Sequence, residues 1–295
     1  MLSYERLALP RLASGRSRTF RRVLRDPLTV AGCGIVAVLA AVAIAAPWLT
    51  LHNPILIDLH ERLLPPGPGH PLGTDDLGRD IYSRIIAGSR ISLQAGFLVL
   101  IFAVAIGTLV GGVSGYLGGW AEEAMMRVTD MFLAFPPLVL AMAVAAALGR
   151  GLTNAMIAVV FVWWPWYARL VRSQVLTLKE REYVLAARAQ GAGPAKILVR
   201  HVLPNTSSQI VVQASLDVGY AILVTASLGF IGLGAQPPLP EWGAMIAQGR
   251  TYLLDDWWYP TFPGLAIMLT VLGFNLIGDG LRDALDPRSG GGRRG

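Results

Sequence analysis

Apolar residues are grouped along this chain into six long runs separated by polar segments. The runs cover residues 28–49, 91–116, 131–148, 152–167, 208–232 and 259–277. A helix needs about 20 residues to cross the hydrocarbon core of a bilayer, and only the fourth run falls clearly short of that length. Transmembrane β-strands would alternate between apolar and polar residues, whereas these runs are continuously apolar. The pattern therefore predicts an all-α membrane protein with six transmembrane helices.

The polar segments divide the chain into tails, loops and a membrane core. We expect a cytoplasmic N-terminal tail over residues 1–27, a first transmembrane helix over 28–49, an external loop over 50–90, a five-helix core over 91–280 and a cytoplasmic C-terminal tail over 281–295. Within the core, the polar segment 172–207 is expected on the cytoplasmic side.

Each external loop contains a predicted helix start. Prolines crowd the first loop and predict extended chain followed by a turn, after which Asp80 is placed to cap a helix that continues into the second apolar run. In the second loop, residues 242–252 are expected to form a short helix on the membrane surface.

Small residues and prolines inside the runs predict how the helices pack. Four glycines recur at four-residue spacing in and after the second run: Gly107, Gly111, Gly115 and Gly119. Stacked on one helical face, they favour a close-packed seam with another helix over a hinge. Pro136 and Pro137 predict a kink in the third span, which fits either the lining of a pathway or adaptation to packing.

Four aromatic residues cluster at the predicted inner end of the fourth span: Trp163, Trp164, Trp166 and Tyr167. Tryptophan and tyrosine are enriched where a helix meets the membrane interface. We therefore interpret the cluster as an interfacial belt, with substrate stacking as the alternative.

Charge and composition support the membrane assignment and indicate its orientation. Only 15% of the residues are charged, against about 25% in soluble domains. Arginines and lysines gather in both tails and after the fourth run, which predicts that both termini are cytoplasmic. This distribution explains the net charge of +6 without a nucleic-acid partner.

The N-terminal run and the cysteine content exclude two other readings. The first apolar run exceeds the roughly 7–15 residues of a signal-peptide core, so it is read as an uncleaved anchor. Cys33 is the only cysteine, which excludes a disulfide or a cysteine-based metal site within one chain.

Motifs of the common catalytic sites are missing from the sequence. Lys179 and Lys196 follow Leu178 and Ala195, so neither lysine belongs to a nucleotide-binding P-loop. HExxH and GxSxG motifs are also absent. Three of the four histidines, His52, His60 and His70, share the first external loop, where solvated side chains are favoured over a metal site. We predict a non-catalytic chain without a metal of its own.

The polar segment 182–205 carries the most information. Its alanine-rich start predicts a helix that ends at Gly191, Gly193 and Pro194. A second short helix would then be closed by Leu203 and Pro204. The result is a compact helix-turn-helix knob with small side chains and charges at its rim, suited to the cleft of a soluble partner. The alternative is an amphipathic segment resting on anionic lipid.

This segment resembles the EAA signature of the membrane permeases of ATP-binding-cassette importers. Ala186 and Ala187 match its alanines, Gly191 its glycine, and residues 201–204 its IxLP ending. Leu185 replaces the signature's glutamate and His201 its isoleucine, as in the dipeptide, oligopeptide and nickel branch. Residues 70–84, 227–246 and 274–288 are similar to the same branch, and the whole pattern is similar to its C-type subunit.

The resemblance implies a type I ABC importer transmembrane fold and a set of partners. These are a homologous permease, two cytoplasmic ATPases and an extracytoplasmic solute-binding protein, with a peptide as substrate. No cofactor is expected in this chain, because ATP and Mg²⁺ would bind to the ATPases. The residues implied to couple to an ATPase are Glu182, Ala186, Ala187, Arg188, Gly191, His201, Leu203 and Pro204.

Two rival functions stay open. A nickel-type permease lies within the same branch, and a secondary transporter driven by an ion gradient lies outside it. Such a carrier would have no evident use for an ATPase-docking knob.

Asp217 lies in the middle of the fifth apolar run. An unpaired charge there costs at least about 2.5–3.5 kcal/mol on insertion scales, so something must compensate it. We favour a water-filled pathway in which the carboxylate attracts the ammonium group of a peptide. A structural bond to a helix neighbour is the close alternative.

Overall fold

The computed structural model describes residues 26–285, and within them the fold is helical. The helices are α2 (Pro27–Leu49), α3 (Ile81–Leu117), α4 (Gly119–Leu133), α5 (Pro137–Leu148), α6 (Leu152–Leu178), α7 (Glu182–Ala189), α8 (Pro194–Ile197), α9 (Leu203–Phe230), α10 (Trp242–Gly249) and α11 (Trp258–Leu285), with short turns η1 (Leu59–Glu61), η2 (Leu198–Val202) and η3 (Arg250–Tyr252). Five helices are long and apolar enough to cross a membrane, and the bent pair of α4 and α5 makes a sixth candidate span. The predicted fold class is confirmed. Most of both predicted tails, 1–27 and 281–295, lies outside the described residues.

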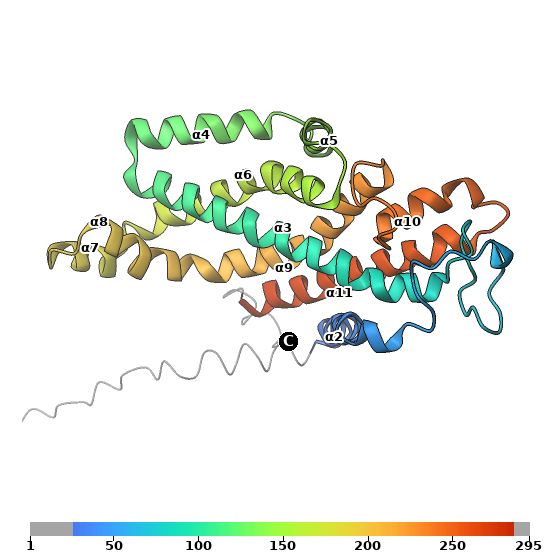
Figure 1. The fold of residues 1–295 in the computed structure, drawn as a ribbon. Coiled ribbons are helices and arrows are strands. Elements are labelled where there is room, and N and C mark those ends of the chain that lie inside the picture. Colours follow the sequence, from blue (N-terminus) through green and yellow to red (C-terminus); the bar gives the residue numbers. More distant parts are fainter. Residues whose placement is uncertain (1–25, 286–295) are drawn as a thin grey trace, which may run out of the picture.

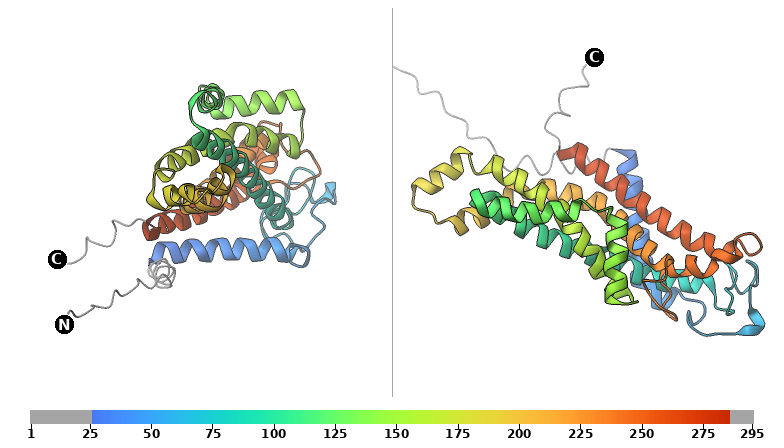
Figure 2. Two further views of the ribbon diagram at one scale, coloured as in Figure 1. Left: turned by 90° about the vertical axis from the view of Figure 1, so that its left-hand side faces the viewer. Right: turned by 90° about the horizontal axis from the view of Figure 1, so that it is seen from above.

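The long helices form an elongated bundle with two distinct ends. Figure 1 shows α7 and α8 projecting at one end and the loop that joins α2 to α3 at the other. Helices α4 and α5 lie on one side of the bundle, and α2 lies on the other (Figures 1 and 2). Outward-facing side chains of α2 such as Val38, Ile44 and Trp48 are exposed and apolar, as expected of a helix that faces lipid.

Helix α3 begins at Ile81, before the second apolar run, and its start is capped by Asp80 as predicted. The carboxylate of Asp80 accepts a hydrogen bond of 2.8 Å from the backbone N–H of Ser83. An acidic N-cap satisfies donors that the first helical turn leaves unpaired. The helix then runs for 37 residues, well beyond the apolar run that predicted it.

The glycine face of α3 is a close-packed seam against α6. A Cβ atom added at Gly107 would lie 2.6 Å from the carbonyl oxygen of Trp164, and one at Gly111 would lie closer still to that of Ala168. A Cβ at Gly115 would meet the carbonyl oxygen of Arg172 at 3.1 Å.

The predicted seam is thus confirmed over three glycines. Gly119 does not belong to it, because it starts α4 with a positive φ of 58° and open space around it. At the same end of the seam, Lys179 Nζ donates a 3.0 Å hydrogen bond to the carbonyl oxygen of Gly115 in the last turns of α3.

The third span is broken at its two prolines. Helices α4 and α5 meet at 91°, which confirms the predicted kink. The segment 118–130, between the second and third apolar runs, is mostly helical and belongs to α4. Its acidic side chains bond to basic residues of α6. Arg172 Nε donates to Glu122 at 2.6 Å, and Arg169 pairs with Asp130 at 2.7 Å. These ion pairs hold α4 alongside α6.

Helix α10 forms where the sequence predicts a helix, but it is buried inside the protein and does not lie on the membrane surface. Trp242 is 1% exposed and Met245 is fully buried, because α10 is inserted between α9 and α11. Glu241, also buried, caps α10 by accepting from the N–H groups of Gly243 and Ala244 at 2.9 and 2.8 Å. Burial raises the pKa of this carboxyl group. The expected surface helix is therefore an internal one.

The seam predicts opposite effects for two glycine-to-alanine changes. Gly111→Ala should destabilise the bundle by about 1–3 kcal/mol, because its methyl group meets the rigid backbone of α6. Gly34→Ala in α2, where nothing lies within 4 Å of an added Cβ, should be neutral or stabilising by up to about 1 kcal/mol. The thermal unfolding midpoints of the purified variants measure the difference. Equal midpoints would show that α3 and α6 are not closely packed.

Candidate functional site

Residues 182–204 form a projection that we call the knob (Figures 1 and 2). It consists of α7, a glycine turn, α8 and η2. Of the residues that the sequence singled out, five are exposed, namely Glu182, Ala186, Arg188, Gly191 and Pro204. The other three, Ala187, His201 and Leu203, are half-buried. The structure therefore brings the predicted residues together on one projection and leaves most of them accessible.

The knob is anchored to the bundle by a small apolar core of its own. Val184 of α7, Ile197 of α8 and Val202 of η2 are buried against Val171 and Val175 of α6. A displacement of the knob would therefore push directly on α6, because these side chains are packed without intervening solvent.

The first turn of the knob depends on glycine. Gly191 has a φ of +82°, a conformation that glycine adopts without steric cost. The turn is closed by backbone hydrogen bonds from Gly191 N–H to the oxygen of Arg188 at 3.0 Å and from Ala192 N–H to that of Ala187 at 3.1 Å. The predicted end of the first helix at this glycine is confirmed.

The second half of the knob differs from the prediction. Leu203 and Pro204 do not close a helix, because the chain passes through the π-helical turn η2 directly into α9. Proline has no N–H to donate, and it is tolerated here because it occupies the first turn of α9. The wide turn keeps Leu203 bonded to the carbonyl of Leu198. The knob and the fifth span are consequently one continuous chain of helix.

The outer surface of the knob mixes apolar and basic groups. Tyr183 and Leu185 are 43% and 42% exposed, and Val199 is 64% exposed. Basic residues beside them, Arg188 and Arg200 among them, are also exposed. Exposed apolar area beside charged groups is typical of a docking surface for a protein partner.

A second candidate site is a cavity of about 660 Å³ between α5, α6 and α9. It is lined by Pro137, Trp163, Trp166, Tyr167, Arg169, Leu170, Gln213, Asp217 and Tyr220. The carboxylate of Asp217 accepts hydrogen bonds from Tyr167 Oη at 2.6 Å and from Gln213 Nε2 at 3.0 Å, with Trp163 Nε1 at 3.5 Å. Asp217 is thus both hydrogen-bonded and at the wall of an open cavity.

The aromatic cluster does not form the expected belt. Helix α6 continues to Leu178, so these residues lie within the helix and not at its end. Trp163 and Tyr167 are buried beside Asp217, whereas Trp166 is 55% exposed at the cavity wall. Sequence reasoning missed Tyr167 and Gln213 as partners of Asp217. Only the four-residue spacing of Gln213 and Asp217 on one helix signalled such a contact.

Charged residues at the opposite end stabilise the loop. Asp75 accepts from Arg79 Nε at 2.6 Å and lies 3.4 Å from Arg84 Nε, and all three side chains are buried. Asp76 accepts from Tyr259 Oη at 2.9 Å. The burial of Asp75, Arg79 and Arg84 favours an internal role for these charges.

The glycine turn of the knob yields a matched pair of variants. Gly191→Ala should cost about 1–2 kcal/mol, because alanine is strained at a φ of +82°. Gly193→Ala should cost little, since Gly193 has a φ of −69° and both positions have open space around them. Hydrogen exchange of the α7 amides should accelerate about 5–30-fold in the first variant only. The same exchange rates in both variants would contradict the assigned turn.

Comparison with known proteins agrees with this geometry. Residues 103–290 match the family described as binding-protein-dependent transport system inner membrane component, and residues 16–66 match the N-terminal TM domain of oligopeptide transport permease C. The probable D,D-dipeptide transport system permease protein DdpC of Escherichia coli (strain K12) is 52% identical, with 90% of this chain and 89% of that protein covered.

Other relatives carry different substrate names. The dipeptide transport system permease protein DppC of Alkalihalophilus pseudofirmus is 46% identical over 91% of this chain and 88% of its own length. The nickel transport system permease protein NikC of Escherichia coli (strain K12) is 44% identical over 86% of this chain and 91% of its own length.

The fold has a counterpart among solved structures. A chain of the MetNI methionine ABC transporter in an inward-facing conformation aligns with a TM-score of 0.54 and 20% identity, covering 68% of this chain and 96% of that one. This likeness supports the type I ABC importer fold. Together, the fold, the EAA-like knob and the family matches show that the chain belongs to the binding-protein-dependent transport system inner membrane components, as a multi-pass permease subunit of an ABC importer.

Proposed function

We propose that this chain forms half of the translocation pathway of an ATP-driven importer of di- and oligopeptides. The observation that carries the proposal is the exposed knob, whose residues match the EAA signature. The names of the 52% and 46% identical relatives support a peptide substrate. The chain itself is non-catalytic, and ATP and Mg²⁺ bind to its partners.

The proposed partners are inferred from the exposed knob, the open side of the cavity and the exposed apolar side chains of α2. One of two cytoplasmic ATPases binds the knob, and an extracytoplasmic solute-binding protein delivers the peptide to the opposite end. A homologous permease covers the side of the cavity that this chain leaves open, which would enclose Asp217 in a shared pathway. Lipid contacts the exposed apolar side chains of α2.

Closure of the ATPases would move the knob and, through it, the walls of the cavity. The knob contacts α6 through Val171 and Val175 and continues into α9 through η2. Helices α6 and α9 also carry Tyr167 and Asp217. A displacement of the knob therefore reaches the cavity through two helices that line it.

We propose that both termini are cytoplasmic. Thr29 at the start of α2 packs against Gly280 near the end of α11. The end of α11, with Arg282 and Leu285, lines a cavity with Ser208 at the start of α9, next to the knob. These contacts support the proposal that the start of α2, the end of α11 and the knob lie on the same side of the membrane.

The docking role is tested by adding bulk to the knob. Ala186→Trp changes an exposed position of α7 and should lower ATP-dependent uptake at least tenfold, because the side chain would block a closely fitting cleft. Val38→Trp, a change at an exposed position of α2 that faces lipid, is the control. Uptake and ATP hydrolysis are measured on the assembled complex in proteoliposomes. Wild-type rates in the Ala186→Trp complex would refute docking at the knob.

Asp217 is proposed to attract the peptide ammonium group. Asp217→Asn keeps the shape of the side chain but removes its charge, so uptake of a free dipeptide should fall about tenfold relative to its N-acetylated form. If Asp217 only joins α9 to Tyr167, the variant should lose thermal stability without changing the preference for the free amine. Competitive uptake of the two peptides separates these outcomes.

Two other functions make different predictions. A nickel permease, suggested by the 44% identical relative, would respond to Ni²⁺ and not to peptides in the ATPase assay with its binding protein. A secondary transporter would move substrate in vesicles that contain an ion gradient but no ATP.

A further inference from the structure

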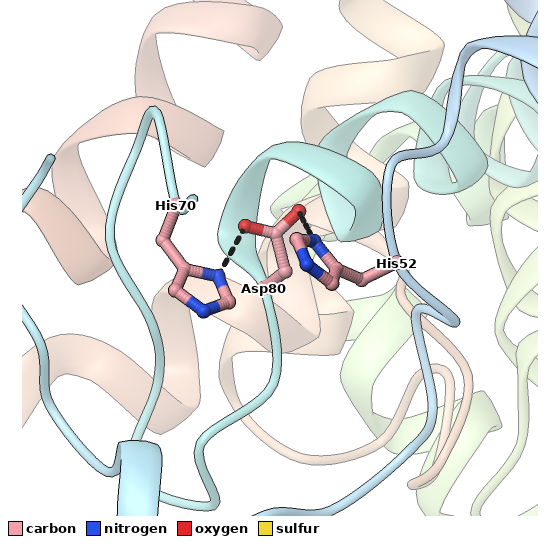
Figure 3. A group of neighbouring side chains, drawn as sticks. All are labelled: His52, His70 and Asp80. Atoms are coloured by element: carbon pink, nitrogen blue, oxygen red, sulfur yellow. Dashed lines mark hydrogen bonds and ion pairs between the residues drawn. The ribbon is translucent and has the colours of Figure 1, made fainter. Parts of the chain in front are cut away.

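Two histidines and an aspartate meet in the external loop, although they are far apart in the sequence (Figure 3). His52 follows α2, His70 lies in the proline-rich part of the loop, and Asp80 caps α3. One ligand-type atom from each lies within 4.8 Å of the other two. His60, the remaining histidine of the loop, is not in this cluster.

The ring of His70 lies between two carboxylates. Its Nδ1 is 3.0 Å from Asp80 Oδ1, and its Nε2 is 3.2 Å from Glu61 Oε2. A neutral imidazole has a single N–H, so it can donate to only one of these acceptors. If Nε2 donates to Glu61, the lone pair of Nδ1 faces a carboxylate oxygen. In that tautomer, a cation between Nδ1 and Asp80 would remove the repulsion between the two.

His52 supplies a second nitrogen at the same place. Its Nδ1 lies 3.7 Å from Asp80 Oδ2, too far for a hydrogen bond, and its ring stacks on His70 with 4.7 Å between centroids. Nitrogen and oxygen ligands of one Zn²⁺ ion lie about 2.0–2.2 Å from it, which places them about 3–4 Å from one another. The distances from His70 Nδ1 to Asp80 Oδ1, 3.0 Å, and from His52 Nδ1 to Asp80 Oδ2, 3.7 Å, fall in that range.

The local structure holds these ligands in place. Ser83 Oγ accepts from the backbone N–H groups of Leu51 and His52 at 3.1 and 3.0 Å, which fixes His52 against the first turn of α3. The side chain of Asp80 is fully buried, and that of His70 is 10% exposed. The His52 side chain is 45% exposed, which leaves an entry path and a position for a water ligand.

We propose that His52, His70 and Asp80 bind one divalent transition-metal ion such as Zn²⁺ or Ni²⁺. Two imidazoles and one carboxylate suit these ions better than Mg²⁺ or Ca²⁺. Glu61 orients the His70 ring by accepting from Nε2, as partners of metal-bound histidines commonly do. The ion joins the end of α2, the loop and the start of α3. This site is independent of the imported substrate, and it differs from the metal-free chain that the sequence predicts.

The test is metal binding by the assembled transporter without its solute-binding protein. A titration with Zn²⁺, monitored by calorimetry, should reveal one binding site in the wild type. In His52→Ala this site should be lost, or its affinity for Zn²⁺ should fall at least tenfold. The exposed position of His52 makes misfolding of this variant unexpected, and its unfolding midpoint in the presence of chelator verifies this. His60→Ala, a change in the same loop, should leave the site intact.

Three results would overturn the proposal. The first is identical Zn²⁺ binding by wild type and His52→Ala. The second is loss of the site in His60→Ala. The third is a wild-type protein whose site stays empty at millimolar Zn²⁺ and Ni²⁺. An increase in the wild-type unfolding midpoint on adding Zn²⁺, absent in His52→Ala, would support the proposed link between the three segments.

Discussion

The close contact between α3 and α6 is the interaction on which the other features depend. Three glycines on α3 bring its axis next to the backbone of α6, and α6 then supplies side chains to both candidate sites. Trp163 and Tyr167 reach the cavity, while Val171 and Val175 form the base of the knob. Bulkier residues along this face of α3 would shift α6 outward, and with it both the cavity wall and the base of the knob. Small side chains thus have a positional role here that larger apolar ones could not perform.

Features governed by local chemistry could be predicted from the sequence. Apolar length identified the spans, the carboxylate of Asp80 identified the start of α3, and the adjacent prolines identified the break before α5. The end of α7 before Gly191 followed from the glycine itself. In each case the cause lies within a few residues of its effect, so the surrounding fold has little influence on it.

The features that were missed arise from contacts between distant segments. Pro204 predicts a helix end unless a π-helical turn precedes it, and no residue pattern indicates that turn. Helix α10 is amphipathic enough for a membrane surface, and only its insertion between α9 and α11 shows that it is internal. The approach of His52 and His70 to Asp80 requires a loop path that proline content alone does not specify. The EAA-like residues lie together on the knob because a continuous stretch of chain carries them.

Both ends of α3 are matched to the electrostatics of the helix. Aligned peptide dipoles leave partial positive charge at the start of a helix and partial negative charge at its end, and a complementary side chain at either terminus contributes about 0.3–1 kcal/mol. Asp80 supplies an anion at the start, and the ammonium group of Lys179 bonds to a carbonyl near the end. Helix α3 therefore has an acidic side chain, Asp80, at its start and a basic side chain, Lys179, bonded near its end beside the knob. The basic end of α3 lies beside the knob, where exposed basic residues are also concentrated, so the charges at the ends of this central helix match the charge distribution along the bundle.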